Sequence, residues 1–297
     1  MIVVKDLTKR YRGRTVVDRV SFTCEPGTVT GFLGPNGAGK STTLRMLCGL
    51  TTPNGGTTAI GGVPYAALPN PGREVGVLLD ASAWHRGRTG RETLLLAAAV
   101  LGAPRDRVDQ LLRLVGLAEA AGRRVGGYSL GMRQRLGIAY ALLGDPRVLV
   151  LDEPANGLDP EGIVWLRTLL RQFADRGGTV LLSSHLLREV EAVADRLVVI
   201  DRGRIVAEGD KDHLLAGSGV RVRARDQQAF QERLVAAGLS VTSATDGALV
   251  VQATADQVGE IAAACGAVLT ELRPSVDGLE ELFLTMTRTH TPQGGNR

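Results

Sequence analysis

Short runs of apolar, β-branched residues alternate with helical patterns and glycines from residue 1 to about residue 216. Strands that alternate with helices are typical of an α/β domain built around a largely parallel sheet. Residues 29–33 are mostly apolar and predict a strand, and residues 148–151 are a continuous apolar run, which indicates a central strand covered on both faces. The pattern therefore predicts one α/β domain over residues 1–216, followed by a short Gly-Ser-Gly linker at 217–219.

The pattern changes after residue 220 and predicts a second, small α+β domain over residues 220–290. The expected order is strand, helix, hairpin, helix and strand, at 220–225, 227–237, 240–252, 255–265 and 267–272. A β-α-β-β-α-β order is typical of a ferredoxin-like or related domain. An amphipathic segment follows at 276–287, and residues 291–297 are predicted to form a disordered tail.

Hydropathy predicts no membrane-spanning helix. The longest candidate run, residues 94–101, is eight residues long, whereas a spanning helix needs about 20 apolar residues. The first residues show no basic stretch followed by an apolar one, so no secretory signal is expected. We therefore expect a cytoplasmic protein that reaches a membrane only by docking peripherally on its inner face.

Charge and cysteine content exclude several classes of function. The formal net charge of +4 comes from 35 basic and 31 acidic residues, and no basic run of five occurs, so no nucleic-acid partner is expected. The three cysteines, Cys24, Cys48 and Cys265, are scattered, which disfavours a disulfide framework or a zinc site. Free thiols are the simpler interpretation.

A phosphate-binding loop follows the apolar run at 29–33. Its sequence fits G-x-x-x-x-G-K-[ST] and opens a predicted helix at 42–49, which is the strand–loop–helix context that the motif requires. Loop N–H groups and the helix N-terminus would surround the phosphates of ATP, and the Lys40 charge would contact the β- and γ-oxygens. A mere glycine-rich turn is the alternative, and the flanking elements argue against it. The predicted nucleotide-binding residues of the loop are Gly34, Pro35, Asn36, Gly37, Ala38, Gly39, Lys40, Ser41 and Thr42.

Two adjacent acids, Asp152 and Glu153, end the apolar run at 148–151. The carboxyl end of a central parallel strand is where ligands bind in such sheets. Asp152, together with the Ser41 hydroxyl, is predicted to hold Mg²⁺. Glu153 is predicted to accept a proton from the water that attacks the γ-phosphate, or to orient it. An acidic loop without a catalytic role is the alternative.

The segment Tyr128-Ser-Leu-Gly-Met-Arg-Gln-Arg-Leu136 resembles the signature of the ABC transporter nucleotide-binding domain, usually written LSGGQ. Tyr128, Leu130 and Met132 depart from that motif, and this variant resembles the drug-, bacitracin- and lantibiotic-type exporters of the ABC-2 group. Ser129 and Gly131 are retained at a predicted helix N-terminus, where they would bind an anion. The resemblance implies a P-loop NTPase fold with a RecA-like core, an antiparallel β subdomain and an α-helical subdomain.

The resemblance also assigns roles to residues outside these motifs. Asp159 matches the D-loop, His185 matches the switch histidine that contacts the γ-phosphate, and Tyr11 matches the aromatic residue that stacks on adenine. For Tyr11 a place in the core is the alternative. Asp80 stands where the family normally has a glutamine that contacts Mg²⁺, so it is a third candidate metal ligand. Trp84, shortly after it, is expected to face a membrane partner, unless it only packs.

As a member of this family the chain is expected to work as a head-to-tail homodimer that holds ATP between Lys40 of one subunit and Ser129 of the other. Pairing with a different ATPase chain stays open. The dimer would drive a permease subunit carried on a separate chain, and the transported substrate is not visible in this sequence. The alternative is a non-transport ABC ATPase acting on nucleic acid or the ribosome; the stretch between residues 80 and 129 is too short for the coiled-coil insertion of the DNA-repair members. A soluble P-loop switch or kinase is a third interpretation, against which the signature segment argues.

Overall fold

A computed structural model describes residues 1–185, 187–216, 219–244 and 246–274. The chain divides into two compact units, Met1–Glu208 and Gly209 onward. The predicted linker residues 217 and 218, the amphipathic segment 276–287 and the tail 291–297 lie outside the described residues.

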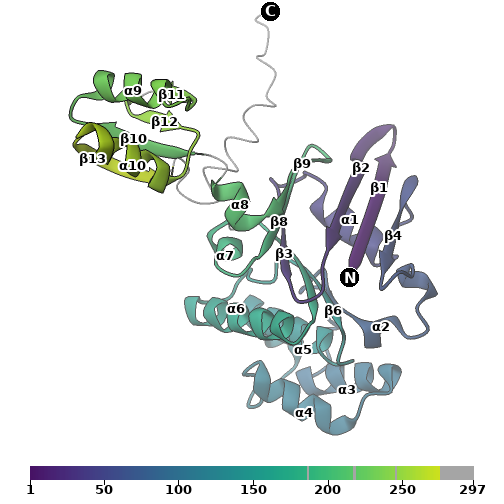
Figure 1. Ribbon diagram of the computed structural model, residues 1–297. Helices are drawn as coiled ribbons and strands as arrows, with labels where there is room; N and C mark the ends of the chain where they lie inside the picture. Colours follow the sequence, from purple (N-terminus) through teal and green to yellow (C-terminus); the bar gives the residue numbers. More distant parts are fainter. Residues whose placement is uncertain (186, 217–218, 245, 275–297) are drawn as a thin grey trace, which may run out of the picture. The chain divides into compact units, whose positions relative to one another are not determined.

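Two sheets form the framework of the first unit within the part of the chain that the structure describes (Figure 1). A three-stranded antiparallel sheet has the order β2-β1-β4. A six-stranded sheet has the order β5-β6-β7-β3-β8-β9, with parallel pairing from β5 to β8. The strands are β1 (Ile2–Tyr11), β2 (Arg14–Cys24), β3 (Val29–Leu33), β4 (Gly55–Ile60), β5 (Val75–Leu78), β6 (Val148–Asp152), β7 (Thr179–Ser184), β8 (Arg196–Asp201) and β9 (Arg204–Asp210).

Helices pack around the six-stranded sheet, and α3, α4 and α5 gather into a separate helical group (Figure 1). Two short 3₁₀ turns, Tyr65–Ala67 and Val125–Gly127, lie in the connections. The α-helices are α1 (Lys40–Leu47), α2 (Pro71–Glu74), α3 (Gly90–Leu101), α4 (Arg105–Leu114), α5 (Leu130–Ala141), α6 (Pro160–Asp175) and α7 (Leu187–Glu191).

Polar side chains determine where three of these helices begin. Thr89 and Glu92 form a capping box at α3, Ser129 caps α5, and Asp159 caps α6 ahead of Pro160. Each such cap stabilises a helix by about 1 kcal/mol. α1 begins at Lys40, two residues before the predicted start, because the phosphate loop runs directly into the helix.

The core of the first unit joins its two sheets. Phe32 of β3, Val150 of β6 and Leu181 of β7 are fully buried in one cluster, together with Leu44 of α1. Phe22 of β2 packs on Phe32 with ring centroids 5.3 Å apart. Burying a side chain of this size contributes roughly 1.5–3 kcal/mol, so the strand that leads into the phosphate loop is anchored from both sheets.

The second unit has the predicted β-α-β-β-α-β order, preceded by α8 (Lys211–Ala216). Its four-stranded antiparallel sheet has the order β11-β12-β10-β13, which is the arrangement of two interleaved β-α-β units in ferredoxin-like domains. One face packs on both helices around Val222, Phe230 and Val258. Its elements are β10 (Val220–Ala224), α9 (Gln227–Ala236), β11 (Val241–Ser243), β12 (Leu249–Val251), α10 (Ala255–Cys265) and β13 (Leu269–Pro274).

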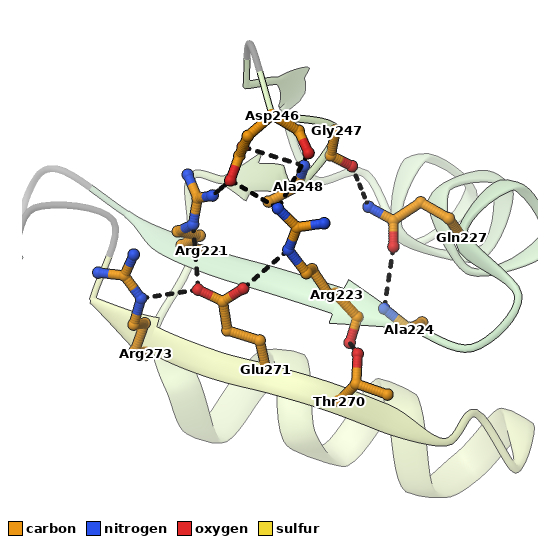
Figure 2. Close-up of polar contacts among 10 residues, drawn as sticks. All are labelled: Arg221, Arg223, Ala224, Gln227, Asp246, Gly247, Ala248, Thr270, Glu271 and Arg273. Carbon is orange, nitrogen blue, oxygen red and sulfur yellow. Dashed lines mark hydrogen bonds and ion pairs between the residues drawn. The ribbon is translucent and has the colours of Figure 1, made fainter.

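The opposite face of this sheet carries a group of paired charges (Figure 2). Arg221 and Arg223 of β10 both contact Asp246 in the β11–β12 turn. Nε of Arg221, Arg223 and Arg273 all lie within 3.1 Å of the Glu271 carboxylate. The two carboxylates pair with the three arginines, which leaves one net positive charge, and the pairs with Asp246 hold the hairpin turn against β10.

Candidate functional site

The phosphate loop lies between β3 and α1, as the sequence predicted. Gly39 has φ 111°, and a Cβ on it would lie 2.8 Å from the backbone oxygen of Val16, so only glycine suits both the backbone and the space. Lys40 is 7% exposed, and its Nζ donates to the carbonyl of Gly34 at 2.6 Å. Burial lowers the pKa of Lys40 below its usual value, although the carboxylates of Glu153 and Asp152 oppose this shift.

Two adjoining cavities open at this loop. The smaller, about 230 Å³, lies over the start of α1 and reaches Glu153. The larger, about 610 Å³, extends from the loop to Arg14 of β2 and Arg202 after β8. Both are lined by Val16 and by Pro35, Asn36 and Gly37. A phosphate-sized space beside a larger one is the shape that a nucleotide needs.

The acidic pair ends β6 beside β7. The Ser183 hydroxyl donates a hydrogen bond to Asp152 and accepts one from the N–H of Glu153 at 3.1 Å. Glu153 has φ 50°, a left-handed conformation that costs a non-glycine residue roughly 1–2 kcal/mol. Such a conformation persists only where the surrounding contacts hold it.

Two of the predicted groups, Lys40 and His185, converge on the Glu153 carboxylate. Nζ of Lys40 lies 3.9 Å from its Oε1, and Nδ1 of His185 lies 2.7 Å from its Oε2. The backbone N–H of His185 also donates to Oε2 at 3.3 Å. Because an ionised carboxylate only accepts hydrogen bonds, Nδ1 carries the proton in this pair. A cation and an imidazole thus contact the carboxylate of Glu153, which lines the smaller cavity together with Lys40.

The signature segment lies at the N-terminus of α5. The Ser129 hydroxyl accepts from the N–H of Met132 at 3.2 Å, so it caps the helix. Gly131 lies against the segment that follows Glu153, since a Cβ on Gly131 would be 2.6 Å from the backbone oxygen of Gly157. Tyr128 is buried, and its hydroxyl donates to Ala120 at 2.7 Å, which explains the aromatic residue at this position.

Tyr11, Asp159 and Trp84 make their contacts at other places. Tyr11 is 47% exposed at the end of β1, with Nζ of Lys9 4.9 Å from its ring centroid. Asp159 caps α6 through the N–H of Gly162 at 2.9 Å. Trp84 packs against Tyr140 of α5, with ring centroids 5.3 Å apart and the rings tilted by 54°.

Asp80 is exposed and forms a tight turn with Ser82. Its Oδ1 accepts from the Ser82 hydroxyl at 2.6 Å and from the Ser82 N–H at 2.7 Å. These two hydrogen bonds, and in a smaller measure the charge of Arg45, lower the pKa of Asp80. The carboxylate is therefore ionised and oriented by its own turn.

Sequence reasoning missed three contributors to the site: Ser183, Gln134 and Val16. Ser183 stands out in the sequence only as a polar residue at the end of an apolar strand. Gln134 belongs to the signature helix, but its partner lies 19 residues away along the chain. Val16 has no chemical signal at all.

No protein-only metal centre exists among the residues that the structure describes, since no three His, Cys, Asp or Glu side chains there are grouped to hold an ion. Likewise, no helix in the described ranges is both long and apolar enough to cross a bilayer.

The chain is similar to known proteins over both units. The ABC transporter family model matches residues 17–156, and a family described as a domain of unknown function matches residues 218–280. The bacitracin transport ATP-binding protein of Bacillus licheniformis is 41% identical over 217 residues, which are 72% of this chain and 71% of that protein. The daunorubicin/doxorubicin resistance ATP-binding protein of Streptomyces peucetius is 39% identical over 251 residues, 81% of this chain and 76% of that protein.

A solved structure has the same fold as the first unit. It is a dimeric ATP-binding cassette in a post-hydrolysis state with ADP and phosphate, 22% identical, with a TM-score of 0.65. The likeness covers 71% of this chain and 98% of that one.

Proposed function

The chain belongs to the family of ABC transporter ATP-binding proteins, and from that premise we propose that its ATP hydrolysis drives export through a separate membrane-spanning subunit. The observation that carries this proposal is the contact of Lys40 and His185 with the Glu153 carboxylate, at a cavity that Lys40 and Glu153 line. Phosphoryl transfer to water requires mainly positioning and charge stabilisation, and these three groups supply both.

Each group has one part in hydrolysis. The ammonium of Lys40 neutralises charge on the β- and γ-oxygens. The carboxylate of Glu153 accepts a hydrogen bond from the attacking water and takes its proton as the bond from that water to the γ-phosphorus forms. The bond from the γ-phosphorus to the bridging oxygen breaks in the same step, and that oxygen leaves with ADP. His185 donates from Nδ1 and so fixes the direction of that carboxylate. The larger cavity takes the nucleoside. The exposed ring of Tyr11, which is not among the residues lining that cavity, stacks on adenine.

The donor set fits Mg²⁺. Magnesium is usually bound by one or two protein groups together with substrate phosphates, so a cluster of three acids is not needed. Ser41 lines the smaller cavity, and Ser183 orients the Asp152 carboxylate, whose charge acts on Lys40 of the same cavity. Bound there, Mg²⁺ neutralises phosphate charge. Asp80 is a third candidate ligand.

The complete site needs a second copy of the chain. Ser129 and Gly131 lie at a helix N-terminus that suits an anion, and we place them against the nucleotide held by the Lys40 of the partner. ATP then stabilises the closed head-to-tail dimer, and hydrolysis releases it. The dimeric state of the similar solved cassette supports this arrangement.

Export is the direction that the similar proteins favour, because their names concern bacitracin transport and daunorubicin/doxorubicin resistance. We place the chain on the cytoplasmic face of the membrane, docked on a permease through the helical group α3–α5. Leu96 and Val100 are more than half exposed on α3 and would enter that interface.

The catalytic part is tested with two variants of the purified chain. Lys40→Ala is expected to abolish ATP binding, whereas Glu153→Gln keeps ATP binding, lowers kcat by at least about 100-fold and accumulates the dimer. Glu232→Gln, an exposed residue of α9, is the matched control. Turnover by Glu153→Gln at the rate of the control would exclude Glu153 as the base.

The transport part is tested by tagging the chain in its native host and identifying what stays bound in detergent. A polytopic membrane protein among the bound proteins supports the exporter. Ribosomes or nucleic acid in its place, with ATPase activity intact, would support a non-transport ABC ATPase.

A further inference from the structure

A buried glutamine of the signature helix contacts the backbone of the catalytic glutamate in the same subunit. Nε2 of Gln134, in the second turn of α5, donates to the backbone oxygen of Glu153 at 2.7 Å. Gln134 is 3% exposed. A buried amide is retained in a core only where its hydrogen bonds are made, so this contact is a defined feature of the site.

The contact acts at a strained residue. Glu153 is in the left-handed region at φ 50°. Its N–H donates to the carbonyl and hydroxyl oxygens of Ser183, both at 3.1 Å. Its carbonyl accepts from the N–H of Asn156 at 3.2 Å and from Gln134. Strand β7 therefore holds one side of the residue and helix α5 holds the other, and together they determine where the carboxylate points.

Two further contacts join α5 to the segment that follows Glu153. Gly131 and Gly157 approach so closely that a Cβ on Gly131 would lie 2.6 Å from the Gly157 oxygen. Nη2 of Arg135 lies 3.7 Å from Oδ1 of Asp159, at the start of α6. Residues 153–159 thus rest on the first turns of α5 at three points.

We propose that Gln134 is a positioning residue that ties the base of one nucleotide site to the signature helix serving the other site. The inference rests on the proposed function, because it takes Glu153 as the base and Ser129 as a contact to the partner's nucleotide. When nucleotide binds at Ser129, the N-terminus of α5 is fixed in place, and Gln134 passes that constraint to Glu153 of the same chain. A contiguous chain of contacts is what such coupling requires.

The first test removes the donor and keeps the volume. Gln134→Met is expected to lower kcat by about 10- to 100-fold, as for a misplaced catalytic group. Nucleotide affinity is expected to stay within about twofold, because the phosphate loop is untouched. Gln172→Met, an exposed change on α6, is the control. Equal losses of kcat and nucleotide affinity would overturn the proposal, and so would an unchanged kcat.

Hydrogen exchange gives an independent readout that does not need turnover. In Gln134→Met the amides of residues 153–159 are expected to exchange faster, while those of residues 34–42 are unchanged. Gln134→Asn, whose side chain is one methylene shorter, is expected to show the same faster exchange. It replaces Gln134→Met in this test if Gln134→Met has a lower melting temperature than the control. Unchanged exchange at 153–159 in both variants would overturn the proposal.

Mixed dimers with two affinity tags then separate action within a chain from action across the dimer. The reference pairs a wild-type subunit with a Glu153→Gln subunit, so that one working base is left. Gln134→Met is expected to lower activity by about 10- to 100-fold when it lies in the subunit with the intact Glu153. It is expected to have little effect when it lies in the other subunit.

The opposite pattern would show that Gln134 acts through the partner's nucleotide, and loss in both arrangements would show a general defect; either result overturns the proposal. An inactive reference dimer would count against the assignment of independent bases in the proposed function. The exchange measurement decides the role of Gln134 in that case as well.

Discussion

Nδ1 of His185 donates a hydrogen bond to Oε2 of Glu153 across 2.7 Å, from the end of β7 to the end of β6. The two residues stand 32 positions apart in the chain, and the parallel pairing of β6 with β7 brings them together. The carboxylate is 20% exposed and is held from one side by the ring and from the other by Lys40.

The histidine is therefore expected to orient the base. His185→Ala should lower kcat by about 10- to 100-fold and leave ATP affinity nearly unchanged, because the imidazole contacts the carboxylate directly. Steady-state ATPase assays with nucleotide titrations measure both quantities. His213→Ala, in α8 of the second unit, is the control. A variant that hydrolysed ATP as fast as this control would show that Glu153 does not need the ring.

Asp80 offers a test that separates metal binding from coupling. Asp80→Gln restores the amide usual in the family and removes a charge that Ser82 holds in place. We expect the ATPase activity of the isolated chain to change by less than about tenfold, equivalent to less than 1.4 kcal/mol, and transport by the complete complex to change more. Loss of ATPase activity alone, rescued by raised Mg²⁺, would instead assign Asp80 to the metal.

The charged face of the second unit makes that unit sensitive to acid (Figure 2). Hydrogen bonds and charges from Arg273, Arg221 and Arg223 lower the pKa of Glu271 below its ordinary 4.5. Burial raises the pKa of Asp246, but the hydrogen bond from Ala248 and the two arginines of β10 outweigh this effect. The pKa of Asp246 is therefore lower than its ordinary value of 3.8.

A carboxyl group whose pKa is lower in the folded state stabilises the fold above its ordinary pKa, and this contribution is lost as pH falls through the folded value. Thermal unfolding of the full chain from about pH 6 to about pH 3, followed by hydrogen exchange in residues 220–274, is expected to show loss of protection in acid. Glu271→Gln should be less stable at neutral pH and less dependent on pH. Equal acid sensitivity in both chains would contradict the prediction.

The three cysteines are expected to differ in reactivity. Burial raises the pKa of Cys24 and of Cys48 to about 12, whereas Cys265 is exposed at the end of α10. The thiolate is the reactive form, and a raised pKa keeps the two buried thiols protonated at neutral pH. Maleimide labelling of the native chain, read by peptide mass spectrometry, should modify Cys265 first by a wide margin. Rapid labelling of Cys24 would show that β2 opens.

Much of the fold followed from local patterns. A mostly apolar run predicted β3, a continuous apolar run predicted β6, and the change of pattern near residue 220 predicted the second unit with its elements in order. The family assignment, the α/β fold and the ATPase activity predicted from the sequence are confirmed by the similarity to ABC transporter ATP-binding proteins. The predicted start of α1 was two residues too late, because helix periodicity does not show how a loop joins a helix.

The functional site also has a part that the sequence predicted and a part that only the tertiary structure shows. The phosphate loop, the acidic pair and the signature segment are each one continuous stretch of sequence. They could be predicted because a loop, a strand end and a helix start are local structures, whose chemistry a few adjacent residues determine. The contacts of Gln134, Ser183 and His185 with Glu153 depend on which strands are neighbours and where α5 packs. Hydrogen bonds form over about 3 Å, so only the tertiary structure, which brings distant residues within that reach, decided how the base is held.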